Sequence, residues 1–339
     1  MDRLAYDVRG RLHSAVQTPQ RRQVLLALGL DDADLRRLLR KRQLQHHHGH
    51  YLDGHIAEEL ARIACAQAAY PGSVVSHFSA AQLTGLRTWS DSKRPSTPPV
   101  DAVWLTRRPD AKRNQRRQDI VVRRAGLAAA DLSRHQWLPL TSPARTVVDL
   151  ARALPLREAI VTVDHALRTG MSLAELEAVL LRQHRWTGIR RARIAIDFGD
   201  PRSESALESI ARTIFADAGL PAPVLQAQFW DGARWMLERV DFWWPQFRTV
   251  AEADGLAKYD ADSPEERRLL IRRSHRRDQR LSDRAVELVH FGWEDALDPR
   301  SDLPARLREA FHRGTSRPGD GPTWRAPDPH APALWLPAA

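Results

Sequence analysis

The chain has 339 residues, enough for two or three domains, and its 52 Lys and Arg exceed its 42 Asp and Glu to give a formal net charge of +10. A basic surplus favours an anionic partner, nucleic acid first and an acidic lipid surface second, although solubility alone also accounts for basic charge. Cys65 is the only cysteine, which excludes an internal disulfide and a cysteine-based zinc site. No apolar run has the length of a signal peptide or a membrane span, so we expect a cytoplasmic protein without a membrane partner.

Residues 1–58 have the outline of a winged helix-turn-helix. The string "TPQRRQVLLALGL" predicts a helix with Thr18 as N-cap and Gly29 as its stop, and "DDADLRRLLRKRQL" predicts a second helix directly after it. The glycines of "QHHHGHYLDGHI" then predict a short hairpin. A helix-turn-helix places its second helix in the DNA major groove. The arginines that lie largely off the apolar face of that helix are the expected DNA contacts: Arg36, Arg37, Arg40 and Arg42. A small helical subdomain with a solvated basic face fits the same residues.

Residues 59–198 are expected to form a mixed α/β connector. The strings "VDAVWLTRR" and "QDIVVRRA" predict strands on either side of the basic run "RRPDAKRNQRRQD", which fits both a phosphate-tracking loop and a solvated loop. Helices follow, one of them opened by Thr141 or Ser142 before Pro143 and one closed by Gly170. Nothing in this segment resembles a reaction centre, so its expected role is structural, as a connector or a dimerising unit.

Residues 199–298 predict a third domain with the element order helix, three strands, helix, strand (αβββαβ). The helix carries Glu204 in its first turn, and "VLQAQFW" and "WMLERVDFWW" flank an Asp-Gly turn. Residues 299–339 contain eight prolines without hydrophobic periodicity, which predicts an extended, largely disordered tail. The whole chain is therefore expected to be an α+β or α/β multidomain protein.

Three carboxylates stand out in the third domain because they occupy predicted strands. Glu252 and Asp254 point to one face of their strand, and Asp241 lies on the preceding strand across a short turn, with Glu204 expected nearby. Oxygen-only clusters suit a hard divalent cation such as Mg²⁺ or Mn²⁺, which we expect Asp241, Glu252 and Asp254 to bind. Lys258 follows as a charge partner or proton carrier. A solvent-facing hairpin that ends at the Asp254-Gly255 turn fits the same spacing.

Two families are similar to parts of this sequence. The strings "SESALESIAR", "RVDFWWP" and "VAEADG", followed by "KY" and "RRD", resemble the very-short-patch-repair-like (Vsr-like) branch of the PD-(D/E)xK nuclease superfamily. The strings "TPQRRQVLLALGL", "HGHYLDG", "TSPARTVVDLAR" and "DHALRTG" look like actinobacterial proteins whose first domain is similar to the AbiEi-type antitoxin. The likeness extends to about residue 298, and the nuclease-like segment is its most specific part.

The nuclease resemblance implies roles for the candidate residues. It makes Asp241 the metal-binding Asp of the motif strand, Glu252 the second acid, and Glu204 the acid of the N-terminal helix. Asp254 falls where many superfamily members have Lys, which is a habit of the Vsr-like branch, and Lys258 stands near the place of a common histidine. A lysine stabilises developing negative charge but is a poor base unless its pKa is lowered.

These patterns lead to two main functional hypotheses. The first is Mg²⁺-dependent hydrolysis of DNA phosphodiester bonds, with Arg273 and Arg277 of the later basic helix on the DNA backbone. The alternative is an AbiEi-type antitoxin-like transcriptional repressor with a catalytically inactive nuclease-like domain. Its partners would be operator DNA and a cognate toxin, and a dimer is compatible with it. A pure interaction scaffold would explain the charge but not the convergent acids.

Overall fold

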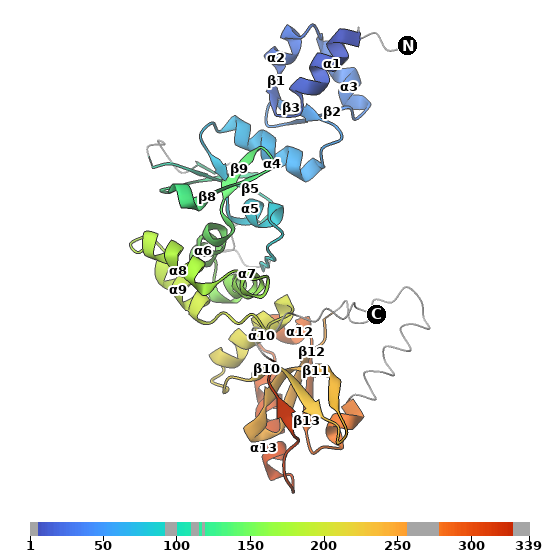
Figure 1. The fold of residues 1–339 in the computed structure, drawn as a ribbon, viewed down its shortest axis with the longest axis vertical. Coiled ribbons are helices and arrows are strands. Elements are labelled where there is room, and N and C mark those ends of the chain that lie inside the picture. The colour runs from blue at the N-terminus through green and yellow to red at the C-terminus, as the bar shows by residue number, and fades with distance from the viewer. Residues whose placement is uncertain (1–5, 92–99, 110–114, 117–118, 256–277, 328–339) are drawn as a thin grey trace. The chain divides into compact units, whose positions relative to one another are not determined.

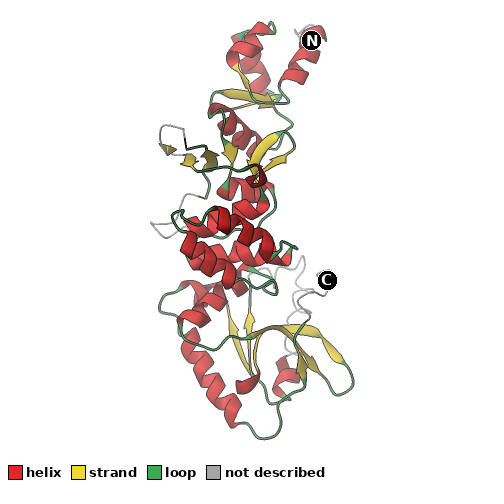
Figure 2. Cartoon of the chain, turned by 60° about the vertical axis from the view of Figure 1, so that its left-hand side comes forward, coloured by secondary structure: helices red, strands yellow, loops and turns green. Residues whose placement is uncertain are grey.

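The computed structural model describes residues 6–91, 100–109, 115–116, 119–255 and 278–327 (Figure 1). Helices and strands alternate along the chain (Figure 2), and the strands form three separate sheets, which confirms the expected mixed α/β composition. Contacts divide the chain into two compact units, residues 1–154 with 173–193 and residues 155–172 with 194–339. The domain boundaries expected from the sequence stay predictions. Within the described ranges, no helix is long and apolar enough to cross a membrane.

The N-terminal part of the first unit packs helices on a small antiparallel sheet of order β1-β3-β2. Its elements are α1 (Tyr6–Ala15), β1 (Gln20–Arg21), α2 (Arg22–Ala27), α3 (Asp32–Arg40), β2 (Leu44–His47) and β3 (His50–Asp53). The helix expected to start at Thr18 and Pro19 begins only at Arg22, because Gln20 and Arg21 pair with β3 instead. Its core is made of buried aliphatic side chains: Leu12, Val16, Leu25, Leu30, Leu35, Leu38 and Leu44.

The hairpin predicted after α3 is present, and the backbone conformation of its turn accounts for a glycine at position 49. His47 pairs with His50, so that His48 and Gly49 form a two-residue loop. Both residues have positive φ, 49° for His48 and 76° for Gly49. Positive φ at both loop positions is the type I′ geometry that matches the twist of an antiparallel pair, and glycine adopts it without steric cost.

The second part of the first unit is a mixed sheet of order β6-β7-β5-β4-β9-β8. The strands are β4 (Val74–Val75), β5 (Val103–Arg107), β6 (Gln115–Arg116), β7 (Ile120–Arg124), β8 (Leu132–His135) and β9 (Leu138–Thr141). The helices are α4 (Glu58–Ala69), α5 (His77–Leu83), η1 (Ala129–Asp131), α6 (Pro143–Ala153) and α8 (Leu173–Arg182). Ser142 caps α6 by accepting a hydrogen bond from the Arg145 amide, as the sequence predicts.

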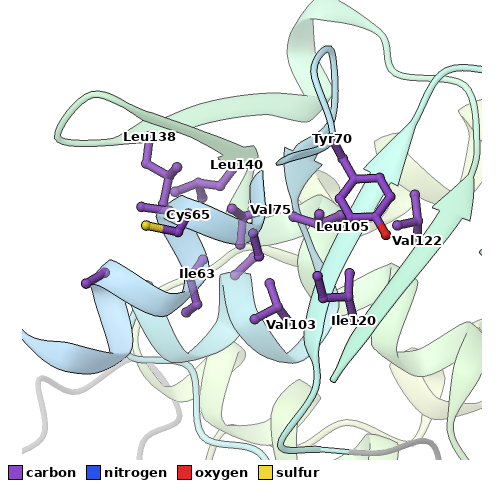
Figure 3. Close-up of a cluster of buried hydrophobic side chains, with 14 of the residues drawn as sticks. Ile63, Cys65, Tyr70, Val75, Val103, Leu105, Ile120, Val122, Leu138 and Leu140 are labelled. Carbon is purple, nitrogen blue, oxygen red and sulfur yellow. The ribbon is translucent and has the colours of Figure 1, made fainter. Parts of the chain in front are cut away.

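Helix α4 packs its apolar side chains against this sheet (Figure 3). Ile63 and Cys65 of α4 pack with Val103 and Leu105 of β5 and with Val122 of β7. Burial raises the pKa of the Cys65 thiol to about 11, so the cysteine stays protonated and unreactive at neutral pH. Cys65 is therefore a buried thiol of the core.

The second unit is built on a sheet of order β13-β12-β11-β10-β14. Its elements are α7 (Leu156–Arg168), α10 (Ala206–Asp217), β10 (Val224–Trp230), β11 (Trp235–Trp244), η2 (Pro245–Phe247), β12 (Thr249–Ala253), β13 (Glu287–Phe291), α12 (Trp293–Leu297), α13 (Leu303–Ser316) and β14 (Trp324–Arg325), and α9 (Ile189–Asp197) leads into it. β10, β11 and β12 are antiparallel neighbours, whereas β13 lies parallel to β12. An aromatic cluster of Phe215, Phe242, Trp244 and Phe291 joins α10 to the sheet.

The prediction of a disordered tail from residue 299 is wrong for the described part of that segment. α13 buries Leu303, Leu307, Ala310 and Phe311, which recur at helical spacing, and Pro304 lies in its first turn, where a missing amide hydrogen costs nothing. β14 then pairs with β10, and Trp324 packs against Trp243. The prediction relied on the proline content and therefore missed a helix whose buried apolar residues form one continuous stripe. Residues 328–339 lie outside the described residues.

Candidate functional site

The start of α3 is fixed by two pairs of polar contacts. Asp31 accepts a hydrogen bond from the Asp34 amide at 2.7 Å, and the Asp34 carboxylate accepts one from the Asp31 amide at 3.3 Å. Such a reciprocal capping arrangement satisfies amides that the helix itself leaves unpaired. Arg22 of α2 binds Asp32 through two hydrogen bonds of 2.9 and 2.6 Å. The Arg22–Asp32 ion pair therefore joins α2 to α3 in addition to the leucine core.

The predicted DNA-contacting arginines of this region differ in their availability. Arg36, Arg40 and Arg42 are exposed, whereas Arg37 is half-buried and pairs with Asp34 at 2.7 Å. Leu35 and Leu38 face the core, so the exposed arginines lie on the opposite side of α3, as the sequence predicts. The geometry presents a cationic helix surface to solvent. It suits a polyanion, and Arg37 is the least available of the four.

Two histidines of the hairpin, His47 and His48, add no positive charge to this surface at neutral pH. Burial lowers the pKa of both His47 and His48, so both imidazoles are neutral at pH 7. His48 Nδ1 lies 3.5 Å from a carboxylate oxygen of Asp119, next to the start of β7. The hairpin turn is thereby tied to the larger sheet of the same unit.

A buried histidine lies at the start of α5. His77 adopts a φ of 49°, which is strained for a residue with a Cβ, and its ring centroid lies 4.9 Å from that of Trp104. Its Nδ1 is 3.0 Å from Ser76 Oγ, which also accepts a hydrogen bond from Thr106 Oγ1 at 2.8 Å. Burial lowers the pKa of His77 to about 4. Because the Ser76 side chain is fully buried, this pair presents no exposed reacting atom, and its role is structural.

The first unit also contains a buried ion cluster centred on Arg145, which is 0% exposed. Its Nε donates to Asp149 at 2.7 Å and its Nη1 to Asp131 at 2.9 Å, while its Cζ lies 4.9 Å from the Trp186 ring centroid. Arg182 of α8 binds Asp131 from the other side at 2.9 Å. The cluster connects α6, η1 and α8 through paired charges, which is how buried charges are tolerated.

In the second unit, Asp241 has a different acidic neighbour from the one expected. One Asp241 oxygen accepts a hydrogen bond from the Ala253 amide at 2.8 Å, and the other lies 3.5 Å from the amide nitrogen of Gln226. The same Gln226 nitrogen donates to Glu208 at 3.1 Å. Glu204, which the resemblance placed here, pairs instead with Arg239 at 2.6 Å. The helix acid beside Asp241 is therefore Glu208.

The sequence did contain a signal for Glu208. α10 is capped by Ser205, whose hydroxyl accepts a hydrogen bond from the Glu208 amide at 3.1 Å, so Glu204 precedes the helix and does not lie in its first turn as the sequence predicts. With that start, Glu208 lies in the first turn and one turn beyond Glu204. Burial, and then the nearby charge of Asp241, raise the pKa of Glu208 to about 8. Glu208 is thus protonated at neutral pH.

Glu252 and Asp254 form a second acidic group around a histidine that the sequence analysis missed. Glu252 is 1% exposed and lies in register with His290 of the parallel strand β13. His290 Nδ1 is 3.0 Å from Asp254, and its Nε2 is 3.4 Å from Asp278. The hydrogen bond with Asp254 raises the pKa of His290, since an adjacent carboxylate favours the imidazolium. Among the described residues, His290 is a cationic partner of Asp254 and Asp278.

The predicted divalent-metal site has no ligand set in this geometry. Within the described residues, no group of three or more His, Cys, Asp or Glu side chains is arranged to hold a metal ion. Asp241 is hydrogen-bonded to a backbone amide and Asp254 to His290. Each of these two contacts engages one oxygen of its carboxylate. Lys258, Arg273 and Arg277 lie outside the described residues, so the metal site and its catalytic role stay predictions.

Comparison with known proteins finds similarity in one region of the chain. Residues 73–198 match the model of the AbiEi antitoxin C-terminal domain family. Uncharacterized proteins from two strains of Mycobacterium tuberculosis are 41% identical to the chain over 119 residues. That stretch is 34% of this chain, and it spans 43% of each relative's own length. The matched family region ends at residue 198, before the segment for which the sequence predicts a Vsr-like nuclease domain, and that resemblance stays a prediction.

Proposed function

We propose that this chain is a DNA-binding regulator of the antitoxin type, with a cognate toxin as its protein partner. The observation that carries this proposal is the match of residues 73–198 to the AbiEi antitoxin C-terminal domain. An antitoxin domain has its function only in relation to a toxin, so the family name itself supplies the class of the partner. The basic surplus of the chain agrees with nucleic acid as a second partner.

We assign the DNA-binding role to residues 1–58, as a winged helix-turn-helix. Three features support this assignment: the tight turn between α2 and α3, the hairpin β2–β3 that follows, and the exposed arginines on the outer side of α3. In a helix-turn-helix protein the second helix lies in the major groove, where arginine hydrogen-bonds guanine or phosphate. α3 would therefore be the recognition helix, with Arg36 and Arg40 as its central contacts and Arg42 at its end.

A DNase I footprint on the DNA upstream of the protein's own gene tests this function. We expect a protected site with two-fold symmetry, because regulators of this kind commonly bind as dimers to palindromic sites. Arg36→Ala combined with Arg40→Ala should remove the protection. Arg37→Ala is the matched control, since Arg37 is engaged by Asp34 and its loss should weaken protection less. Equal protection by wild type and the double variant would contradict the role of α3.

Metal-dependent DNA cleavage by Asp241, Glu252 and Asp254, with Mg²⁺ or Mn²⁺, is a second candidate. The observation in its favour is that Glu208 and Asp241 share the Gln226 amide on the sheet that carries Glu252. A plasmid-cleavage assay at low salt separates it from the first candidate. Nicked or linear product from wild type, and none from Asp241→Ala or Glu252→Ala, would establish an enzyme. A retarded but intact plasmid would leave the regulator as the better account.

A further inference from the structure

The two acids of α3 have direct partners within the first unit. Asp32 accepts two hydrogen bonds from Arg22, and Asp34 pairs with Arg37 at 2.7 Å. The hydrogen bond from Arg22 lowers the pKa of Asp32, and the charge of Arg36 makes a smaller contribution in the same direction. The direct ion pairs of these acids are therefore made by Arg22 and Arg37, and they leave the outer side of the helix to other residues.

That outer side carries a stripe of three residues, here called the outer stripe: Ala33, Arg36 and Arg40. Leu35 and Leu38 of the same helix are buried. Residues that are three and seven positions apart lie on one face of a helix, so positions 33, 36 and 40 all point away from the leucines. All three residues are exposed. The outer stripe is thus the part of α3 that faces a ligand most directly.

The alanine of the outer stripe permits a close approach to base pairs. The major groove is about 12 Å wide, and a helix with its side chains is about 10 to 12 Å across, so the fit is tight. Ala33 adds only a methyl group to the outer side of the first turn. The two arginines follow one and two turns later, and their side chains are long enough to reach base edges from a backbone that lies in the groove.

The chemistry of a guanidinium favours guanine among the four bases. Guanine alone offers two acceptors, N7 and O6, on its major-groove edge. Arginine presents its donors as a planar fork that matches two acceptors, and it has no acceptor for the amino groups of adenine and cytosine. Phosphates also match the fork, but they line the edges of the groove. The centre of the outer side of a helix faces the groove floor, where the base edges lie.

The spacing of the two arginines sets the spacing of the bases. Arg36 and Arg40 are four residues apart, which corresponds to about 6 Å along a helix axis. Successive base pairs are about 3.4 Å apart along a duplex. A helix that lies along the major groove therefore places these two side chains about two base pairs apart.

We propose that Arg36 and Arg40 read two guanines about two base pairs apart in each half of the DNA site. Each arginine donates two hydrogen bonds, to N7 and O6 of its guanine. The inference rests on the DNA-binding function proposed above and specifies the bases that the same helix recognises. Arg42, which follows the end of α3 and is exposed, contributes phosphate contacts that carry no sequence information.

Selection of duplexes from a randomised library by the full-length chain tests this inference. The wild type should enrich two guanines at the stated spacing. Arg36→Gln should change the preferred base at one of these positions to adenine, and Arg40→Gln at the other, because a glutamine amide matches adenine N6 and N7. Glutamine is also a good helix former, so α3 is kept. Arg37→Gln is the matched control, since Arg37 pairs with Asp34 and its loss should leave the enriched sequence unchanged.

A modified base checks the contact atom directly. 7-Deazaguanine lacks the N7 acceptor and still pairs with cytosine. Its introduction at either selected position should weaken binding of the wild type at least about fivefold, the lower end of what a bidentate pair contributes. The Arg36→Gln variant should be insensitive to this change at the position that it no longer reads as guanine.

The outcomes separate this inference from the function on which it rests. An enriched sequence without guanines at this spacing, or glutamine variants that enrich the wild-type sequence, would refute the inference while DNA binding stands. Glutamine variants that bind all sequences more weakly, with no change in the preferred bases, would show that the arginines contact phosphates and would refute it as well. A wild-type chain that enriches no sequence contradicts the sequence-specific regulator itself.

Discussion

The strongest quantitative prediction concerns the buried carboxyl group of Glu208. Its pKa is raised from 4.5 to about 8, first by burial and then by the charge of Asp241. A raised pKa means that the folded chain holds the proton more tightly than the unfolded chain does. The resulting stabilisation is fully present below pH 4.5 and is lost as the pH rises to about 8. We therefore expect the second unit to become less stable across this interval.

The size of the effect follows from the two pKa values. Each pKa unit corresponds to about 1.4 kcal/mol, so a change from 4.5 to about 8 sets a ceiling of about 5 kcal/mol. Glu208 lies beside other acidic groups, and such neighbours spread the loss of stability over a wider pH range. We expect roughly 2 to 3 kcal/mol between pH 5 and pH 8. Glu208→Gln removes the ionisable group and keeps an oxygen that accepts from the Glu204 amide and from Gln226. It should be more stable than wild type at pH 8 by this amount.

Urea-dependent hydrogen exchange of peptides from residues 206–253 measures the unfolding free energy of this unit alone. The control is Glu309→Gln, because Glu309 is an exposed acid of α13 in the same unit. The control should follow the wild-type pH profile. A wild type whose stability does not fall between pH 5 and pH 8, or a Glu208→Gln variant that falls equally, would refute the argument. Added Mg²⁺ should not remove the pH dependence unless a metal binds these carboxylates.

Other predictions concern packing and buried charge. Gly314→Ala should destabilise the second unit by at least 1 to 3 kcal/mol, because a Cβ there would overlap the Phe247 carbonyl oxygen, and a lower midpoint in thermal denaturation would show it. Arg145→Met should cost up to about 3 kcal/mol, because it removes the fully buried cation shared by Asp131 and Asp149 and leaves each acid with a single arginine, Arg182 or Arg152; unchanged urea unfolding would contradict this. Trp324→Ala should cost about 2 kcal/mol and speed hydrogen exchange in β10, whereas unaltered exchange would show that β14 contributes nothing.

Local signals in the sequence predicted the N-terminal helices and hairpin well. α3 follows from a capping aspartate and leucines at helical spacing, and the hairpin from glycine at its turn. Both depend on residues close in sequence, where cap, period and turn chemistry agree. The start of α2 was wrong because pairing with β3 overrode the cap signal at Thr18.

The acidic cluster could be predicted only in part. The alternation of side chains along a strand predicts that Glu252 and Asp254 lie on one face, but it does not identify the residues that they contact. His290 comes from a strand that reaches the site by parallel pairing, and single-sequence patterns do not determine which strands pair in parallel. Glu208 was missed because the sequence places Glu204 in the first turn of this helix, whereas the helix begins after Ser205 and it is Glu208 that lies beside Asp241.

In the described part of residues 299–339 the prediction was wrong because it rested on the proline content and not on the spacing of the apolar residues. The prolines predicted disorder, yet Leu303, Leu307 and Phe311 keep a helical stripe between them. Proline at the start of a helix is compatible with it, so proline position mattered more than proline content.

The most direct test of the central proposal is the ratio of affinities for two duplexes. The full-length chain would be titrated, at 150 mM KCl, into labelled DNA from upstream of its own gene and into a scrambled duplex of equal length and composition. A DNA-binding regulator should prefer its own site by about 10³-fold or more. Arg36→Ala with Arg40→Ala should reduce that ratio towards one. Equal affinity of the wild-type chain for the two duplexes would contradict a sequence-specific regulator.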